Sequence, residues 1–371
     1  MTAAPRIMMS CDAIGGVWQY SLDLCRTLTA QGSVIALAVL GPPPGPRQRA
    51  QAEAIDGLSL FETGHDLDWT AADPRRIEEA GEHLALLAAA HDADIVHLNS
   101  PALAAAADFP APVVTVAHSC VGTWWDAVRG GPLPADLAWR DELHRTGLDR
   151  ADLAIAPSRS FAAATAAHHR LARMPLAIHN GRVASGASSR AMHDFAFTAG
   201  RLWDDAKNLA TLDRAAARLS VPFRAAGPCD GPNGEHIDFA AIAPLGHLDD
   251  EAVADRLASR PVFVSASLYE PFGLAVLEAA MAGCPLVLSD IPTFRELWAD
   301  VAVFVDPRDD FGFAEAIDRL IGDARIRIER GDAARIRARR YCPVATGTAT
   351  MAAYRRLLDG NTLPARARAL A

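Results

Sequence analysis

Residues 262–281 of this 371-residue chain read VFVSASLYEPFGLAVLEAAM. The apolar start predicts a short buried strand that ends near Ala266. Pro271 and Gly273 then interrupt the pattern, and we expect a helix from about Gly273 to Met281. A buried strand that leads through a short loop into a helix is the repeating unit of an α/β fold with a parallel sheet.

The same alternation of apolar runs and helical patterns recurs along the whole chain. In the first half we expect strands at residues 7–9, 34–40, 95–98, 113–118 and 153–156, with a helix over 17–29. In the second half we expect strands at 195–200, 223–227, 262–265 and 286–289, with a helix over 209–219. The predicted fold class is therefore α/β, with two Rossmann-like halves in tandem and a ligand cleft at the carboxyl ends of their strands.

Small residues fill positions 184–189, a composition typical of a linker between domains. We therefore expect an N-terminal Rossmann-like domain at residues 1–184 and a second one at 185–345. The remaining helical segment, 346–371, contains Arg355, Arg356, Arg366 and Arg368. It either packs back on the first domain or stays a solvated terminal helix.

The composition excludes several classes of protein. With 45 acidic and 36 basic residues the net charge is −9, which argues against a general electrostatic grip on nucleic acid. We find neither a membrane-spanning apolar stretch nor a signal peptide, so we expect a cytoplasmic protein, at most in peripheral contact with the inner face of the membrane. The six scattered cysteines predict reduced, mostly buried thiols. Lysine occurs once in the sequence, at Lys207.

Several common motifs are missing from the sequence. Lys207 lacks the glycines of a P-loop, and no dinucleotide-binding glycine fingerprint follows a strand. Asp66 and Asp68 form an acidic triplet that fits either a metal site or a chance match. His168 and His169 are adjacent on an expected helix and should point in different directions, so we expect them not to share a metal easily. Trp124 and Trp125 either stack on a sugar ring, dip into a membrane surface or simply pack.

The loop in residues 262–281 predicts an anion site. The backbone amides of Phe272, Gly273 and Leu274 stand at a helix N-terminus, where the helix dipole favours a phosphate. Glu270 precedes this site, and Glu278 lies one turn into the helix on the face of Leu274. One carboxylate is placed for a sugar and the other for ribose hydroxyls. Because apolar residues surround Glu278 in the sequence, its carboxylate needs a partner.

The pair Glu270 and Glu278 resembles the E-x7-E motif of retaining nucleotide-sugar glycosyltransferases, and residues 265–296 as a block resemble glycosyltransferase family 4. Gly15 and Gly16 are similar to the glycine loop that the family places beside the donor phosphates. Asn180-Gly181 matches the family's Asn-Gly ahead of the second domain. The family usually continues with Val-Asp, whereas this chain continues with Arg182-Val183.

Two further positions complete the resemblance. Arg201 and Lys207 are six apart after a strand, the spacing at which the family clamps a diphosphate. Two fixed cations and helix amides can stabilise a departing diphosphate without a metal ion. His118 matches the cleft histidine of the family, and we expect its side chain to emerge at the end of its strand and bind the donor sugar.

The resemblance implies a GT-B fold and a retaining, metal-independent glycosyltransferase. Its expected substrates are a nucleotide-diphosphate sugar and a saccharide, lipid-linked or small-molecule acceptor, with no cofactor and no bound metal. The first domain would bind the acceptor and the second the donor. The alternatives are a nucleotide-sugar epimerase or a phosphorylase of the same architecture, and a non-catalytic nucleotide-sugar-binding protein. A phosphorylase that uses pyridoxal phosphate would need a Schiff-base lysine, for which Lys207 is the only candidate.

Overall fold

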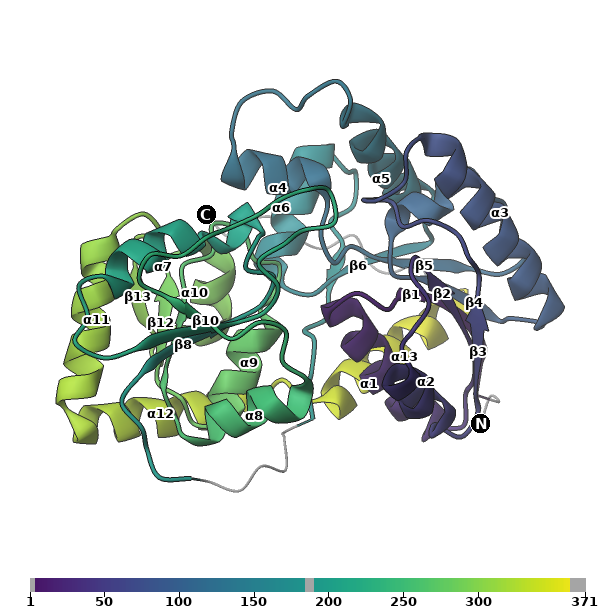
Figure 1. The fold of residues 1–371 in the computed structure, drawn as a ribbon. Coiled ribbons are helices and arrows are strands. Elements are labelled where there is room, and N and C mark those ends of the chain that lie inside the picture. Colours follow the sequence, from purple (N-terminus) through teal and green to yellow (C-terminus); the bar gives the residue numbers. More distant parts are fainter. Residues whose placement is uncertain (1–3, 184–189, 361–371) are drawn as a thin grey trace. The chain divides into compact units, whose positions relative to one another are not determined.

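The structure, a computed structural model, describes residues 4–183 and 190–360 (Figure 1). These residues divide into two compact units. Unit 1 contains the described residues up to Asp126, then Gly130–Gly181, then those from Pro343 on, and unit 2 contains Ala127–Arg129 and Arg182–Cys342. The expected linker at 184–189, Arg366 and Arg368 lie outside the described residues. The boundaries after Gly181 and after Cys342 each fall three residues before the domain boundaries that we predicted from the sequence.

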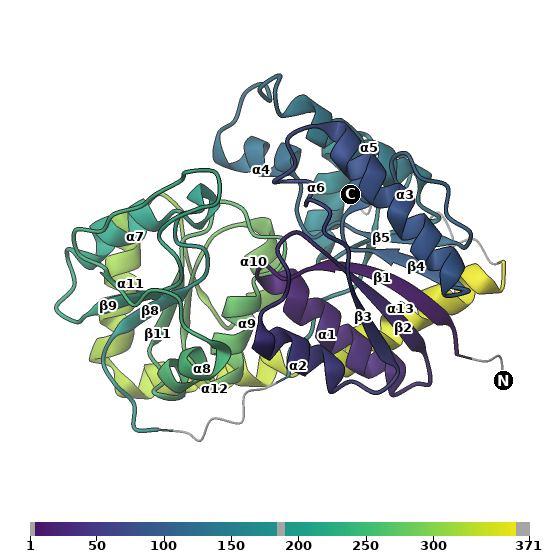
Figure 2. The same ribbon diagram turned by 45° about the vertical axis from the view of Figure 1, so that its right-hand side comes forward.

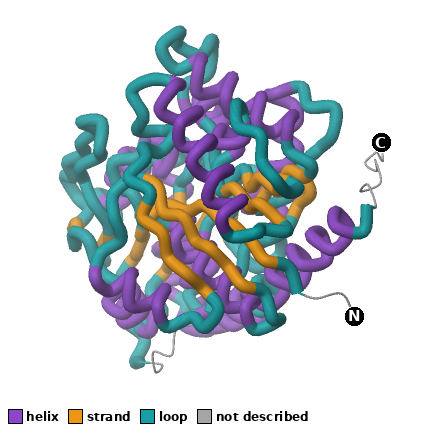
Figure 3. The backbone as a smooth tube through the Cα atoms, turned by 90° about the vertical axis from the view of Figure 1, so that its right-hand side faces the viewer, coloured by secondary structure: helices purple, strands orange, loops and turns teal. Residues whose placement is uncertain are grey.

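Unit 1 is built on a seven-stranded sheet with the order β3-β2-β1-β4-β5-β6-β7, in which all neighbours are parallel. Its strands are β1 (Arg6–Asp12), β2 (Val34–Leu40), β3 (Leu58–Glu62), β4 (Ile95–Leu98), β5 (Val113–Val116), β6 (Leu153–Ala156) and β7 (Leu176–Ala177). Figure 3 shows β1, β2 and their neighbours running alongside one another among helices. Since both faces of the central strands are covered, their sequences are continuously apolar, which is why the apolar runs predicted them.

Helices cover both faces of this sheet. They are α1 (Gly16–Thr29), α2 (Pro46–Glu53), α3 (Pro74–Ala90), η1 (Pro101–Ala104), α4 (Val121–Val128), α5 (Ala138–Arg150), α6 (Arg159–His169) and α13 (Pro343–Leu358). On one face, Trp18 of α1 and Tyr354 of α13 share a core cluster with β1 and β2, and Figure 2 shows the two helices side by side. On the other face, Ile77 and Leu84 of α3 pack with Met8 of β1.

Unit 2 repeats the architecture with a six-stranded sheet of order β10-β9-β8-β11-β12-β13, again parallel throughout. Its strands are β8 (Ala196–Ala199), β9 (Phe223–Ala226), β10 (Ala243–Pro244), β11 (Val262–Ser265), β12 (Leu286–Ser289) and β13 (Val303–Val305). Its helices are η2 (Asp205–Lys207), α7 (Leu209–Ala216), α8 (Asp250–Ala258), α9 (Leu274–Met281), α10 (Pro292–Trp298), α11 (Asp310–Gly322) and α12 (Ala324–Ala338). Phe263 packs on the α9 side of the sheet, while its neighbours Val262 and Val264 pack on the α7 and α11 side.

The chain leaves unit 1 after Gly181 and returns to it at Pro343, and hydrogen bonds join the chain segments on either side of these two crossings. Within unit 2, the Arg182 amide donates to the Tyr341 carbonyl at 3.2 Å. Within unit 1, Thr346 Oγ1 donates to the His179 carbonyl at 2.8 Å. The helical segment expected at residues 346–371 therefore starts three residues earlier, at Pro343, and α13 belongs to the core of unit 1.

The predicted strands at 34–40, 95–98, 153–156, 262–265 and 286–289 coincide with β2, β4, β6, β11 and β12. Three others are shorter than predicted. β5 ends at Val116, two residues before His118, and β8 and β9 end before Gly200 and Gly227, whose φ angles of 150° and 139° turn the chain out of the sheet. α7 also ends early, at Ala216.

All six cysteines lie in the described residues as free thiols, with Cys229 and Cys342 only partly buried. Across residues 4–183 and 190–360, every helix is too short or too polar to cross a bilayer.

Candidate active site

The loop between β11 and α9 forms the expected helix N-terminus. Gly273 is the residue that caps α9, at φ 90° and ψ 66°, a left-handed conformation that favours glycine. A Cβ atom at this position would lie 3.1 Å from Cε1 of Phe294. Among the residues that the structure describes, no side chain caps α9, so its first amides remain available to an anion.

The side chains of the predicted amide donors differ from one another in their surroundings. The ring of Phe272 is buried in the core of unit 2 and meets Tyr341 edge-on at 5.8 Å. Leu274 packs against the same core cluster. Only the backbone of these two residues can therefore serve a ligand at the α9 N-terminus.

Lys207 and Glu270 are brought together by two neighbouring loops. The Lys207 ammonium lies 2.5 Å from Oε2 of Glu270, whose side chain is only 14% exposed. The Leu268 amide donates to the Ala206 carbonyl at 2.8 Å, and the Asn208 amide group donates to the Ala266 carbonyl at 3.1 Å. These bonds fix a cation and a carboxylate beside the start of α9.

Arg201 is held by a residue that the sequence reasoning did not single out. Its guanidinium lies 2.8 Å from Oδ2 of Asp204, a buried carboxylate, and over the ring of Trp203 at 5.5 Å. Asp204 also accepts the Ala206 amide through Oδ1 at 3.0 Å and so begins η2. Asp204 therefore positions Arg201 and the turn that carries Lys207. The Asp three residues after an Arg at a strand end was the available signal.

Glu278 has the partner that its apolar neighbours require. Nε of Arg182 lies 2.7 Å from its Oε1. The expectation of a deeply buried carboxylate is wrong, since the Glu278 side chain is 30% exposed. Arg182 is the residue at which this sequence departs from the family's Val-Asp pattern, and its role was missed because 96 positions separate it from Glu278.

His118 lies in unit 1, two residues beyond β5 rather than at the strand's last position. The difference arises because pairing with β6 stops at Val116. Its Nε2 lies 2.9 Å from Oδ1 of Asn99, so this nitrogen carries the hydrogen. Asn99 is fixed in turn, since its amide group donates to the Ser10 carbonyl at 2.6 Å.

The electrostatic surroundings keep the His118 imidazole neutral. Burial, followed by the neighbouring His97, lowers the pKa of His118 to about 3. The ring of Tyr20 meets it edge-on at 4.6 Å. A neutral imidazole with Nε2 as donor presents Nδ1 as an acceptor.

The glycine pair Gly15-Gly16 opens α1 in unit 1. Gly15 has φ 90°, a conformation that favours glycine, and a Cβ atom placed there would have no heavy atom within 4 Å, so this part of the backbone faces open space. α1 likewise begins without a side-chain cap. The candidate residues thus fall into two sets: Gly15, Gly16 and His118 in unit 1, and all the others in unit 2.

Of the acidic triplet Asp66–Asp68, the last carboxylate is engaged within unit 1. Oδ2 of Asp68 accepts a hydrogen bond from Ser100 at 2.6 Å, and burial raises the pKa of Asp68. The acid triplet therefore serves the packing of unit 1 through Asp68. The two tryptophans of α4, Trp124 and Trp125, are half-buried, with ring centroids 6.3 Å apart.

A cluster of three buried side chains was missed from the sequence: Cys120, His144 and His169. The expectation that His168 and His169 cannot approach one ion is also wrong, because their ligand atoms and one from Asp141 lie within 4.8 Å of one another. His169 is the last residue of α6, and its ring meets that of His168 edge-on at 4.6 Å.

Comparison with known proteins agrees with the two-unit fold. The model of Glycosyltransferase Family 4 matches residues 14–182, and that of Glycosyl transferases group 1 matches residues 194–323. The two matches together span most of the chain and fall on the two sheets in turn. The chain belongs to the group 1 glycosyltransferases of family 4.

Among relatives with known names, glycogen synthase of Mycobacterium tuberculosis is 39% identical over 120 residues, which cover 31% of this chain and 29% of that protein. The phosphatidyl-myo-inositol mannosyltransferase of Mycobacterium leprae is 36% identical over 111 residues, or 29% of this chain and 28% of that protein. Both matches thus span less than a third of the relative's length.

Solved structures resemble the whole chain. Sucrose-phosphate synthase of Thermosynechococcus elongatus has a TM-score of 0.78 at 18% identity and covers 96% of this chain and 100% of its own. HepE of Anabaena, in complex with UDP-glucose, has a TM-score of 0.71 at 17% identity, with coverage of 96% and 100%. Two Rossmann-like units of this kind define the GT-B fold, as predicted.

Proposed function

We propose that the chain is a retaining glycosyltransferase that moves a sugar from a nucleotide-diphosphate sugar to a saccharide, lipid-linked or small-molecule acceptor, with no metal ion at the site of transfer. The observation that carries the proposal is the Lys207–Glu270 pair at 2.5 Å beside the uncapped N-terminus of α9. It supplies a fixed cation, a fixed carboxylate and free amides in one place.

The cations would stabilise the leaving group. When the bond between sugar and diphosphate breaks, the diphosphate departs with the bonding electrons and gains negative charge. Lys207 has three N–H donors, of which Glu270 takes one, so two remain for phosphate oxygens. Arg201 would add a planar pair of donors, and the amides of Gly273 and Leu274 would add the helix dipole. Such prearranged donors lower the barrier because they need no reorganisation.

The two carboxylates would hold the donor's hydroxyl groups. Glu270, restrained by Lys207, would accept hydrogen bonds from the transferred sugar. Glu278, restrained by Arg182, would accept them from the ribose. The family resemblance assigns His118 of unit 1 to the same sugar, and its neutral ring is suited to a hydroxyl partner. Retention would follow from front-face attack guided by the leaving phosphate.

Thermal-shift screening against UDP-, GDP- and ADP-sugars should identify the donor. A donor at a concentration well above its dissociation constant stabilises the fold by a few kcal/mol. HepE, whose structure contains UDP-glucose, makes that compound the first to test. With the donor known, Lys207→Ala and Glu278→Ala should each lower transfer at least about tenfold, equivalent to about 1.4 kcal/mol.

Arg190→Ala is the matched control, because it removes a cation of unit 2 that forms an exposed pair with Asp255 at 2.8 Å. It should retain full transfer. Unchanged transfer in both Lys207→Ala and Glu278→Ala would contradict the proposed site.

A further inference from the structure

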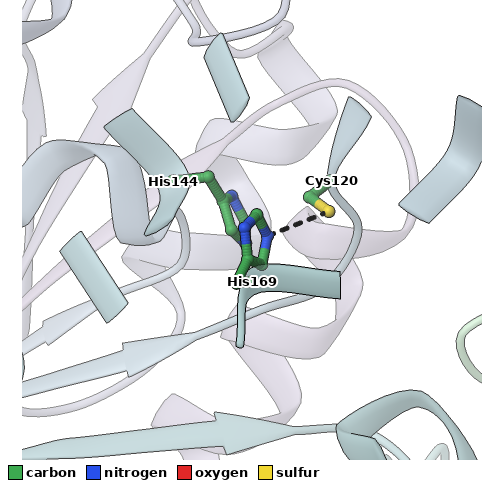
Figure 4. A group of neighbouring side chains, drawn as sticks. All are labelled: Cys120, His144 and His169. Atoms are coloured by element: carbon green, nitrogen blue, oxygen red, sulfur yellow. Dashed lines mark hydrogen bonds between the residues drawn. The ribbon is translucent and has the colours of Figure 1, made fainter. Parts of the chain in front are cut away.

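Three side chains that the transfer reaction does not use converge inside unit 1. Cys120 directly precedes α4, His144 is on α5, and His169 ends α6. Their exposed fractions are 7%, 3% and 5%. Figure 4 shows the Cys120 sulfur facing the His169 ring, with the His144 ring beside it. A thiol and two imidazoles are a ligand set that zinc prefers.

The spacing of the ligand atoms fits one ion. Sγ of Cys120 lies 3.5 Å from Nε2 of His169, and one ligand atom of each of the three residues lies within 4.8 Å of the others. Zinc binds sulfur at about 2.3 Å and imidazole nitrogen at about 2.0 Å, which in a tetrahedron places the two atoms about 3.5 Å apart. The observed separation already equals the one that an ion would impose.

A buried nitrogen in the cluster has no partner. Nε2 of His144 is enclosed and accepts or donates no hydrogen bond within the described structure. Such a buried, unsatisfied group destabilises the fold unless something binds it. The His144 ring stacks on that of His169 at 5.4 Å and 20°, which provides no hydrogen bond.

The two imidazoles are in the protonation state that a metal needs, whereas burial raises the pKa of the Cys120 thiol to about 11 and keeps it protonated without a metal. Burial lowers the pKa of His144 to about 3 and that of His169 to about 4, so both rings are neutral and keep a lone pair. A metal would displace the proton of the Cys120 thiol into solvent.

Nearby acidic groups offset the positive charge that remains. The Asp141 carboxylate lies 3.0 Å from Nε2 of His168, whose Nδ1 lies 2.6 Å from Asp126. Gly122 makes this packing possible, because a Cβ there would lie 2.1 Å from both Asp141 Oδ1 and His168 Nε2. One thiolate and two neutral rings leave a divalent ion with a single positive charge, beside which these carboxylates stand.

We propose that Cys120, His144 and His169 bind a Zn²⁺ ion, with a water in the fourth position, as a structural site of unit 1. The ion links the segment after β5, which carries His118 two residues earlier, to α5 and α6. It takes no part in sugar transfer, and the proposal does not depend on the proposed function.

The test is metal analysis of the full chain purified from zinc-supplemented culture, by elemental mass spectrometry. Wild type should contain about one zinc per chain. Cys120→Ser and His169→Gln should contain at least tenfold less, whereas Cys229→Ser, which removes a thiol of unit 2, should keep its zinc. Circular dichroism checks that each variant is folded.

A second measurement does not depend on variants that fold. Metal-free wild type, prepared with a chelator, is titrated with Co²⁺ and with Zn²⁺ alone. Co²⁺ should produce thiolate-to-metal absorption that saturates at one ion per chain, and Zn²⁺ should raise Tm. Protein that is metal-free as purified, lacks this absorption and shows no Zn²⁺-dependent rise in Tm overturns the proposal and leaves a hydrogen-bonded thiol–imidazole pair.

Discussion

Units 1 and 2 share a parallel-sheet architecture but surround their candidate residues with different kinds of polar group. In unit 2 these groups are ion pairs, Lys207–Glu270 and Arg182–Glu278. In unit 1 they are neutral and buried: His97 shares hydrogen bonds with Asn99 and with Tyr354. One sheet topology thus supports either a charged or an uncharged site, depending on the side chains that follow each strand. Under the proposed function, the charged set of unit 2 would hold the donor diphosphate.

The largest expected effect tests how tightly unit 2 holds its strand ends. A Cβ at Gly227 would lie 1.7 Å from the Gly200 carbonyl oxygen, and φ there is 139°. Gly227→Ala should lower the free energy of unfolding by at least about 3 kcal/mol, from overpacking and backbone strain together.

The control for this substitution comes from unit 1. Gly64 also has a positive φ, 70°, but a Cβ atom placed there would have no heavy atom within 4 Å. Gly64→Ala should cost only about 1 kcal/mol. Urea unfolding measures both variants, and equal losses would show that the steric argument is mistaken.

The next expected effect is a loss of stability of unit 1 at acidic pH. Burial lowers the pKa of His97 to about 4, and the hydrogen bond to Asn99 opposes part of that shift. Nδ1 of His97 is hydrogen-bonded to the Tyr354 hydroxyl, and His118 lies close enough for the two imidazoles to interact. The unfolded state therefore binds a proton more readily than the folded state. This contribution to stability is complete above pH 6.5 and is lost as pH falls to about 4, by up to about 3 kcal/mol.

Unfolding by urea between pH 7 and pH 4 measures this dependence. His97→Asn should flatten the pH profile relative to wild type. An identical slope in the variant would assign the acid sensitivity to other groups.

A smaller effect tests whether Arg182 positions Glu278. Arg182→Ala removes the partner at 2.7 Å. If Glu278 holds the ribose, donor KM should rise about tenfold with kcat nearly unchanged, because binding is lost equally in the ground and transition states. Arg182→Lys should recover part of the loss. A fall in kcat alone would place Arg182 in the chemical step instead.

The smallest effect is expected where an ion pair is exposed. Arg190 and Asp255 are each about half-exposed and 2.8 Å apart. Arg190→Ala should change the free energy of unfolding by less than about 0.5 kcal/mol. Unfolding at low and high salt checks this, and a larger loss would mean that exposed pairs matter in unit 2 as much as those of its site.

Much of the fold followed from the sequence because buried parallel strands are continuously apolar. The run at 262–265 matched β11 in full, whereas the run ending at His118 overshot β5, since an apolar residue after a strand looks like part of it. Lys207 and Glu270 were each predicted to serve the donor, but their direct contact was not predicted, because 63 positions separate them in the sequence. The Cys120–His169 contact joins residues 49 positions apart, with three helical segments in that interval, so no spacing in the sequence could predict it.

The bonds at the two chain crossings have a practical consequence for protein engineering. Arg182, the first residue of the long segment of unit 2, is hydrogen-bonded to Tyr341, next to the last residue of that segment, so the two ends of the segment already meet. In unit 1 the His179–Thr346 bond holds the other two ends together. The segment Arg182–Cys342 is therefore an insertion into unit 1 whose two ends lie side by side, so it can be exchanged for the equivalent segment of another family member. Truncating the chain after Cys342 would instead remove α13 from the core of unit 1.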